Sequence, residues 1–274
     1  MDNPENKSSL FAGGAKASSD PTVSSKPLIM IPVTAEDVER ERRRRALKWV
    51  AAGLVVLLAG GIVYKRINDP RNAREAFDAG MRLMGATRYD QAILNFNRTV
   101  DLQPDFAEAY RMRGRAYVAE SNLDQAVRDF TRVAELLPGD TLALVERGFA
   151  RLDKKDFSNA IADASRAIAL NPKLARAYNL RGTALRASAD PRKAIDDFSK
   201  AIELEPNLDN YFQRASTYQG LGDHARAIAD FNKALDEDPQ QPHIYYARAA
   251  SRAAVGDHAG AAADNAMGHK IDGY

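Results

Sequence analysis

The chain has 274 residues, and its 39 Lys and Arg side chains nearly balance 37 Asp and Glu side chains, so the formal net charge is +2. A charge this balanced gives no indication of a nucleic-acid partner. The sequence has no cysteine, which excludes disulfide bonds and thiolate metal sites.

Residues 1–45 are predicted to form a disordered N-terminal tail with a basic end. Asn, Ser, Gly, Lys and Pro dominate residues 1–33, which show neither a helical nor a strand period. Thr34, followed three residues later by Asp37, has the spacing of a helix N-cap. A charged helix is therefore expected from there to Arg45.

A transmembrane helix is predicted over residues 46–65. Its centre, from Trp49 to Tyr64, is uncharged and lies between Lys48 and Lys65. Sixteen helical residues span roughly 24 Å, which is short for a hydrocarbon core of about 30 Å. Aromatic residues at both ends suit the two interfaces, and basic side chains there can reach the headgroups.

Two other interpretations of this stretch compete with an uncleaved anchor. The small residues at 59–61 resemble a signal-peptide cleavage site, which would release a secreted soluble protein. Residues 43–48 resemble a twin-arginine export motif, although Ala46 stands where that motif prefers Phe. More than forty residues precede the apolar run, which is longer than a usual signal n-region, so the anchor is preferred.

Basic residues flanking the span predict its orientation. Six precede it and four follow it, namely Arg40, Arg42, Arg43, Arg44, Arg45 and Lys48, then Lys65, Arg66, Arg71 and Arg74. The excess before the span predicts a cytoplasmic N-terminus. The span is expected in a bacterial inner membrane. The rest of the chain, which follows a short linker at 66–72, is then expected outside the cytoplasm, in the periplasm.

From residue 73 onward the sequence repeats about every 34 residues. Helical spacing is broken at regular intervals, which predicts six helical hairpins over about 73–106, 107–140, 141–174, 175–207, 208–241 and 242–274. The recurring prolines are Pro104, Pro138, Pro172, Pro206 and Pro239. The small residues of the second helices are Ala92, Ala126, Ala160, Ala194, Ala227 and Ala261.

Two further registers complete the pattern. One holds Gly80, Gly114, Gly148, Gly182, Ala215 and Ala249, and the other Phe96, Phe130, Ala164, Phe198, Phe231 and Asn265. A 34-residue period with this order of small, aromatic and proline positions resembles the tetratricopeptide repeat family. The resemblance implies an all-α solenoid of antiparallel helix pairs with a concave groove.

If that geometry holds, the first helix of each copy lines the groove. The candidate groove residues are Phe77, Met81, Arg111, Arg115, Phe149, Arg176, Asn179, Arg186, Phe212, Gln213 and Tyr246. Apolar ends flank a middle with several arginines, which suits an extended peptide that carries an acidic group. Ordinary solvated helix faces are the alternative interpretation.

Arginine and aspartate recur together in the last five copies. The candidate ladder residues are Arg113, Asp129, Arg147, Asp163, Arg181, Asp197, Arg214, Asp230, Arg248 and Asp264. The first copy lacks both partners, since it has Ala79 and Asn95. Joint presence and joint absence predict that the two side chains meet and brace the hairpins. A charged stripe for a ligand is the alternative.

The sequence predicts a membrane-anchored scaffold that binds a protein or peptide in its groove. It shows no phosphate-binding loop and no nucleophile or zinc motif, so we expect no catalytic residues, metal or cofactor, and no nucleic-acid partner. The alternative function is a structural subunit that self-associates through its repeat ends.

Overall fold

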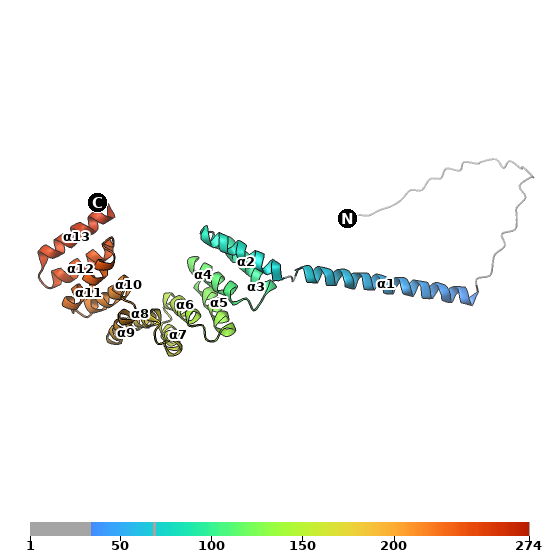
Figure 1. The fold of residues 1–274 in the computed structure, drawn as a ribbon, viewed down its shortest axis with the longest axis horizontal. Coiled ribbons are helices and arrows are strands. Elements are labelled where there is room, and N and C mark those ends of the chain that lie inside the picture. The colour runs from blue at the N-terminus through green and yellow to red at the C-terminus, as the bar shows by residue number, and fades with distance from the viewer. Residues whose placement is uncertain (1–33, 68–69, 274) are drawn as a thin grey trace, which may run out of the picture. The chain divides into compact units, whose positions relative to one another are not determined.

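The computed structural model describes residues 34–67 and 70–273 (Figure 1). The chain divides into two units, residues 1–60 and 61–274, which are described separately. All regular structure in the described ranges is helical, which confirms the predicted all-α class. The predicted disordered stretch at 1–33 lies outside the described residues.

The first helix, α1, spans Ala35–Ile67. At its start the Asp37 backbone N–H donates to Thr34 Oγ1 at 3.3 Å, and the Thr34 N–H donates to Asp37 Oδ2 at 3.1 Å. This reciprocal cap confirms the predicted N-cap. Residues 35–45 are therefore helical, and the predicted disordered tail does not extend through them.

The apolar part of α1 is exposed in the structure. The exposed fraction is 68% for Leu47, 78% for Trp49 and 74% for Leu57. No helix in the described part of the chain is both long and apolar enough to cross a bilayer. The predicted transmembrane helix at 46–65 is thus not supported, and the side chains of residues 62–65 lie outside those described.

The predicted linker at 66–72 is mostly helical. The α1 helix ends at Ile67, and α2 begins at Pro70, so five of these seven residues lie in helices. Proline suits the first turn of α2, because its missing N–H would have no partner there.

Six helical hairpins follow in the second unit, and each pairs an even-numbered helix with the next odd-numbered one. In chain order the helices are α2 (Pro70–Gly85), α3 (Tyr89–Leu102), α4 (Ala107–Ala119), α5 (Leu123–Leu136), α6 (Thr141–Asp153), α7 (Phe157–Leu170), α8 (Ala175–Ala187), α9 (Pro191–Leu204), α10 (Leu208–Gly220), α11 (His224–Glu237), α12 (Pro242–Ala254) and α13 (His258–Asp272).

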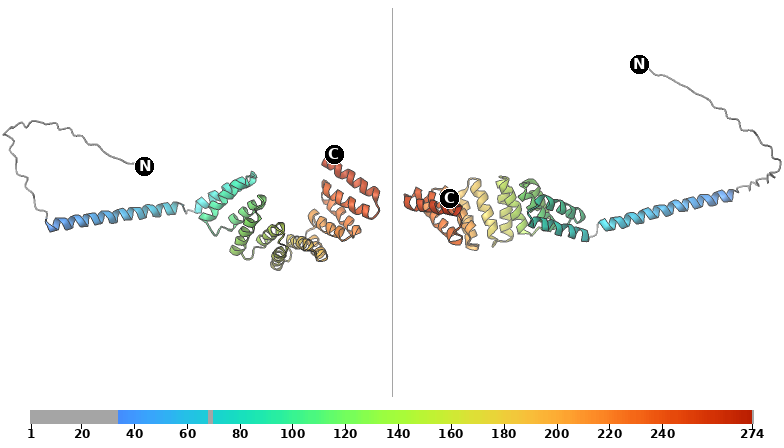
Figure 2. Two further views of the ribbon diagram at one scale, coloured as in Figure 1. Left: turned by 180° about the vertical axis from the view of Figure 1, so that it is seen from behind. Right: turned by 90° about the horizontal axis from the view of Figure 1, so that it is seen from above.

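Within this unit the hairpins stand side by side in chain order along a curved row (Figures 1 and 2). Each second helix contacts the first helix of the next hairpin, and first helices also touch one another across hairpins, as α6 and α8 do. The first helices lie on the inner side of the curve in Figure 1. The core is therefore distributed between neighbouring hairpins.

Small residues allow the two helices of a hairpin to approach closely. Phe130 in α5 is 1% exposed, and a Cβ added to Gly114 in α4 would lie 2.8 Å from its ring. Gly182 faces Phe198 in the same way. The glycine register of the sequence thus marks where an aromatic ring of the second helix packs on the backbone of the first.

In the third hairpin a different side chain packs against the glycine of the first helix. Its second helix, α7, has Ala164 in place of the aromatic residue, and the space is filled by Leu180 from α8 of the next hairpin. A Cβ on Gly148 would lie 2.4 Å from Leu180 Cδ2. The missing ring is therefore replaced from a neighbouring repeat and not from within the copy.

Candidate functional site

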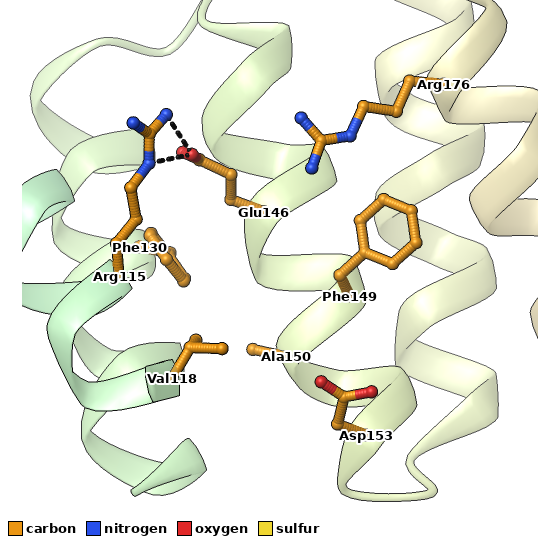
Figure 3. A pocket seen from close by; sticks show the side chains of 8 residues that line it. All are labelled: Arg115, Val118, Phe130, Glu146, Phe149, Ala150, Asp153 and Arg176. Carbon is orange, nitrogen blue, oxygen red and sulfur yellow. Dashed lines mark hydrogen bonds and ion pairs between the residues drawn. The ribbon is translucent and has the colours of Figure 1, made fainter. Parts of the chain in front are cut away.

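Two adjoining cavities lie on the side of the array formed by the first helices. The larger, of about 420 Å³, is lined by Arg115, Val118, Phe130, Glu146, Phe149, Ala150, Asp153 and Arg176 (Figure 3). The second, of about 330 Å³, is lined by Phe149, Arg176, Asn179, Glu205, Asn207, Asp209 and Asn210. Phe149 and Arg176 belong to both, so the two cavities form one continuous candidate site.

Arg176 of α8 lies over the ring of Phe149 from α6. The guanidinium carbon is 5.3 Å from the ring centroid, within the range of a cation–π contact. Figure 3 shows the two side chains facing each other across the space between the helices. Arg176 is exposed and forms no ion pair with any described residue. It is thus a cation held in place by an aromatic ring and available to a ligand.

Glu146 neutralises two of the predicted groove arginines. Its Oε1 atom accepts hydrogen bonds from Arg115, with Nε 2.6 Å away, and its Oε2 atom lies 3.6 Å from Arg111 Nη1. Arg111 also pairs with Glu108 and Asp140. The Glu146 side chain is only 7% exposed, and Oε2 has no hydrogen-bond partner in the described part of the chain. This network leaves Arg111 and Arg115 little excess positive charge for a ligand.

Asp153 is a second carboxylate of the larger cavity, and unlike Glu146 it is not paired with any arginine of the described ranges. It is the last residue of α6, lines the larger cavity below Phe149 (Figure 3), and forms no ion pair within the described residues. Asp153 is exposed overall, and partial desolvation of its carboxyl raises its pKa above the ordinary value. Because no described cation pairs with it, its negative charge remains available to a ligand.

The structure places the predicted groove residues in different environments. Three are buried, with exposed fractions of 6% for Phe77, 7% for Arg111 and 6% for Asn179. Phe77 packs on Phe96 and Phe106 in the core, and the Asn179 amide donates to Asp209 and Asn210. Phe77 therefore belongs to the core of the first hairpin, while Arg111 and Asn179 hold other polar groups in position.

The remaining predicted groove residues keep some exposed surface. Arg115, Phe149 and Arg176 meet in the larger cavity. Arg186 donates to Gln213 Oε1 at 2.6 Å, and burial lowers its pKa. The other three do not join this site: Met81 lies in α2, Phe212 in α10 against the His243 ring, and Tyr246 in α12, where its hydroxyl donates to Asp272.

Sequence reasoning did not single out several cavity residues. Asp153 lies one helical turn beyond Phe149, so extending the groove register by four residues would have found it. Glu205 and Asn207 lie in the connection between α9 and α10, outside any first helix. No helical periodicity indicates that this connection borders the groove.

The ladder residues lie in contact in all five copies. Each arginine donates from Nε and Nη2 to both oxygens of the aspartate sixteen residues later, as Arg113 does to Asp129 at 2.8 and 2.7 Å. Burial raises the pKa of Asp129, and Arg113 opposes that rise. The aspartates are 3–7% exposed, so these ion pairs are largely internal, although Arg181 and Asp197 also line a separate cavity of about 390 Å³.

Each ladder arginine also contacts the preceding hairpin through its Nη1 atom. The acceptors lie in the second helices and are Asn97, Thr131, Ser165, Ser199 and Asn232. The sixth copy has Ala266 at this register. The sequence thus held a signal for this third contact, which ties each hairpin to its predecessor.

Comparison with known proteins identifies the repeats. Residues 77–141, 175–208 and 208–241 match models of the tetratricopeptide repeat. These segments are therefore tetratricopeptide repeats, as the sequence pattern predicted. No curated protein matches the sequence.

Solved structures show the same fold at low sequence identity. The crystal structure of PilW, a type IV pilus biogenesis factor, is 16% identical with a TM-score of 0.67, covering 74% of this chain and 94% of that one. Pseudomonas aeruginosa PilF is 14% identical with a TM-score of 0.63, covering 73% and 92%. MamA residues 41–end from Desulfovibrio magneticus RS-1 is 22% identical with a TM-score of 0.57, covering 62% and 97%.

Proposed function

We propose that the protein is a scaffold that binds an extended segment of a partner protein along its first-helix face. The observation that carries the proposal is the pair of adjoining cavities that share Phe149 and Arg176. The cavities lie between successive first helices and are open to solvent. An extended peptide can bind there, because it can contact several hairpins at once. Among the described residues no cluster of His, Asp and Glu has the arrangement of a metal site.

Site-specific photo-crosslinking in cells tests this function. A benzoyl-phenylalanine at Arg176, which is exposed in the cavities, should give discrete adducts with a partner protein. The matched control is the same probe at Leu94, which is 66% exposed on the second helix α3. Equal adducts from both positions, or none from Arg176, would contradict binding on the first-helix face.

We also propose that residues 46–65 attach the protein to a membrane. Two features support this proposal: the uncharged run within this stretch, and the exposure of 55% or more at each of Leu54, Val55, Val56, Leu57 and Leu58. A helix that is apolar on all sides is stable only in apolar surroundings, which lipid supplies. The excess of basic residues before the run supports a cytoplasmic N-terminus, with the repeats on the other side.

Membrane attachment is tested by flotation of the full chain with lipid vesicles. The unchanged protein should float, and Leu54→Arg should reduce flotation, because a charge at the centre of a span costs about 2.5–3.5 kcal/mol. Arg192, exposed on α9, provides the control Arg192→Leu. Orientation is tested separately by protease digestion of a C-terminal tag in spheroplasts. Digestion is expected, and protection of the tag would instead place the repeats on the cytoplasmic side.

A further inference from the structure

The charges around the two cavities indicate the chemistry of the partner. The sequence alone favoured an acidic ligand because arginines occupy the middle of the groove. In the structure Arg115 is already paired with Glu146, and Arg111 with Asp140, Glu108 and, at 3.6 Å, Glu146. Arg176 is the one cation of the two cavity linings that forms no ion pair within the described ranges.

Carboxylates without cationic partners outnumber that arginine. Asp153 lines the larger cavity, and Glu205 and Asp209 line the smaller one, and none of the three forms an ion pair with a described residue. Asp209 accepts hydrogen bonds from the neutral amides of Asn179 and Gln213. Arg186 interacts with Asp209 electrostatically without forming an ion pair. The three carboxylates still exceed the two cations Arg176 and Arg186, so the uncompensated charge of the site is negative, which favours a basic partner.

The floor of the larger cavity is apolar. It is formed by Val118, Phe130, Phe149 and Ala150, and Asp153 lies at the same end as Val118 and Ala150 (Figure 3). A volume of about 420 Å³ is sufficient for one large aliphatic or aromatic side chain. A side chain seated there would exclude water from the neighbouring carboxylate and strengthen its attraction to a cation.

We propose that this cavity holds an apolar side chain of an extended partner segment, and that a nearby lysine or arginine of the same segment pairs with Asp153. This proposal rests on the proposed function, since it specifies the partner of the same groove. The smaller cavity offers Glu205 and Asp209 to a second basic residue farther along the segment. Partial desolvation, which already raises the pKa of Asp153, makes a pairing cation there more favourable than at a fully solvated carboxylate.

A random peptide display library selected on the full chain tests the proposal. Selected peptides should combine an apolar residue with Lys or Arg a few positions away. Selection on Asp153→Arg should replace that basic preference by Asp or Glu. The matched control is Asp101→Arg, the same charge change at an exposed position of α3, and its selected peptides should remain basic.

Affinities of one selected peptide, measured by fluorescence anisotropy, make the test quantitative. Asp153→Ala should weaken binding by about two- to fivefold, the upper range for an ion pair at an exposed carboxylate. Val118→Phe, at a half-buried position, should fill the cavity and weaken binding at least as much. Circular dichroism establishes that each variant keeps its helical content.

Failure of this inference is distinguishable from failure of the proposed function. Peptides that lose affinity on Val118→Phe, but show no basic preference and no response at Asp153, would overturn the partner chemistry and leave groove binding intact. Peptides that respond to neither variant, or a library that yields no binder, would overturn both proposals. A preference for acidic peptides would assign the site to Arg176 and overturn the inference.

Discussion

Arg181 and Asp197 form a two-pronged ion pair between the helices of the fourth hairpin. Arginine Nε lies 2.8 Å from Asp197 Oδ2, and Nη2 lies 2.7 Å from Oδ1. The hydrogen bonds that Arg181 donates to Asp197 raise the pKa of Arg181, and the arginine also lies over the ring of Tyr178. The aspartate is 6% exposed, so the arginine is its main source of charge compensation.

A double-mutant cycle measures this pair. Arg181→Ala should lower the free energy of unfolding by about 2–3 kcal/mol, because it leaves a buried carboxylate without its partner. Adding Asp197→Ala should then cost much less than it does alone, with a coupling energy of about 1–3 kcal/mol. Urea unfolding of the four proteins gives these values. Arg166→Ala, at an exposed arginine of α7, is the control and should be nearly neutral, and additive losses at Arg181 and Asp197 would contradict the pairing.

Gly182→Ala should destabilise the fourth hairpin by about 1–3 kcal/mol, the range for overpacking a tight core. The added Cβ would lie 2.8 Å from Cε1 of the fully buried Phe198 ring. Thermal unfolding should show a lower Tm. Gly220→Ala is the matched control, because a Cβ there meets nothing within 4 Å and alanine is the better helix former. An unchanged Tm for Gly182→Ala would show that the ring can move aside.

Ala189→Gly should stabilise the protein by about 0.5–1 kcal/mol. Ala189 ends the turn after α8 with φ 70°, a left-handed conformation that alanine adopts only with strain. Gly222 and Gly256 occupy the same turn position in the last two hairpins. The control is Ala187→Gly, two residues earlier in the last turn of α8, which should destabilise. A lower Tm for Ala189→Gly would contradict the strain.

Asp140 should make the array sensitive to acid. Partial burial acts to raise its pKa, but hydrogen bonds from the Ala143 N–H and from Arg111 outweigh burial, so the pKa lies below its ordinary value of 3.8. Its stabilising contribution is therefore present above pH 3.8 and is lost as the pH falls through the lowered value.

Asp140→Asn tests this pH dependence. The variant should be less stable at pH 7, because it loses the charge that pairs with Arg111, while its amide oxygen can still cap α6. The difference in unfolding free energy between the two proteins should shrink below about pH 4. A difference that stays constant down to pH 2 would show that the carboxylate does not titrate below its ordinary value in the folded protein.

The repeat fold was predictable because its signal occurs six times in one chain. Each copy alone gives an ambiguous helical pattern, but prolines, alanines and aromatic residues in the same phase leave one architecture. The ladder contacts were predictable for the same reason. The positions equivalent to Arg113 and Asp129 hold arginine and aspartate together in five copies and lack both in the first. The candidate groove was predicted less well, because register alone does not distinguish Arg176, which is exposed, from Arg111, which is buried.

The sequence by itself determined the hairpin period, the all-α class and the position of each ladder pair, because these depend on contacts repeated at fixed spacing. Only the tertiary structure decided which groove charges remain uncompensated. Glu146 reaches Arg115 from thirty-one residues away, and Leu180 fills the space that Ala164 leaves in the preceding hairpin. Such contacts join non-equivalent positions of neighbouring copies, and their geometry depends on how the hairpins stack, which no periodic pattern specifies.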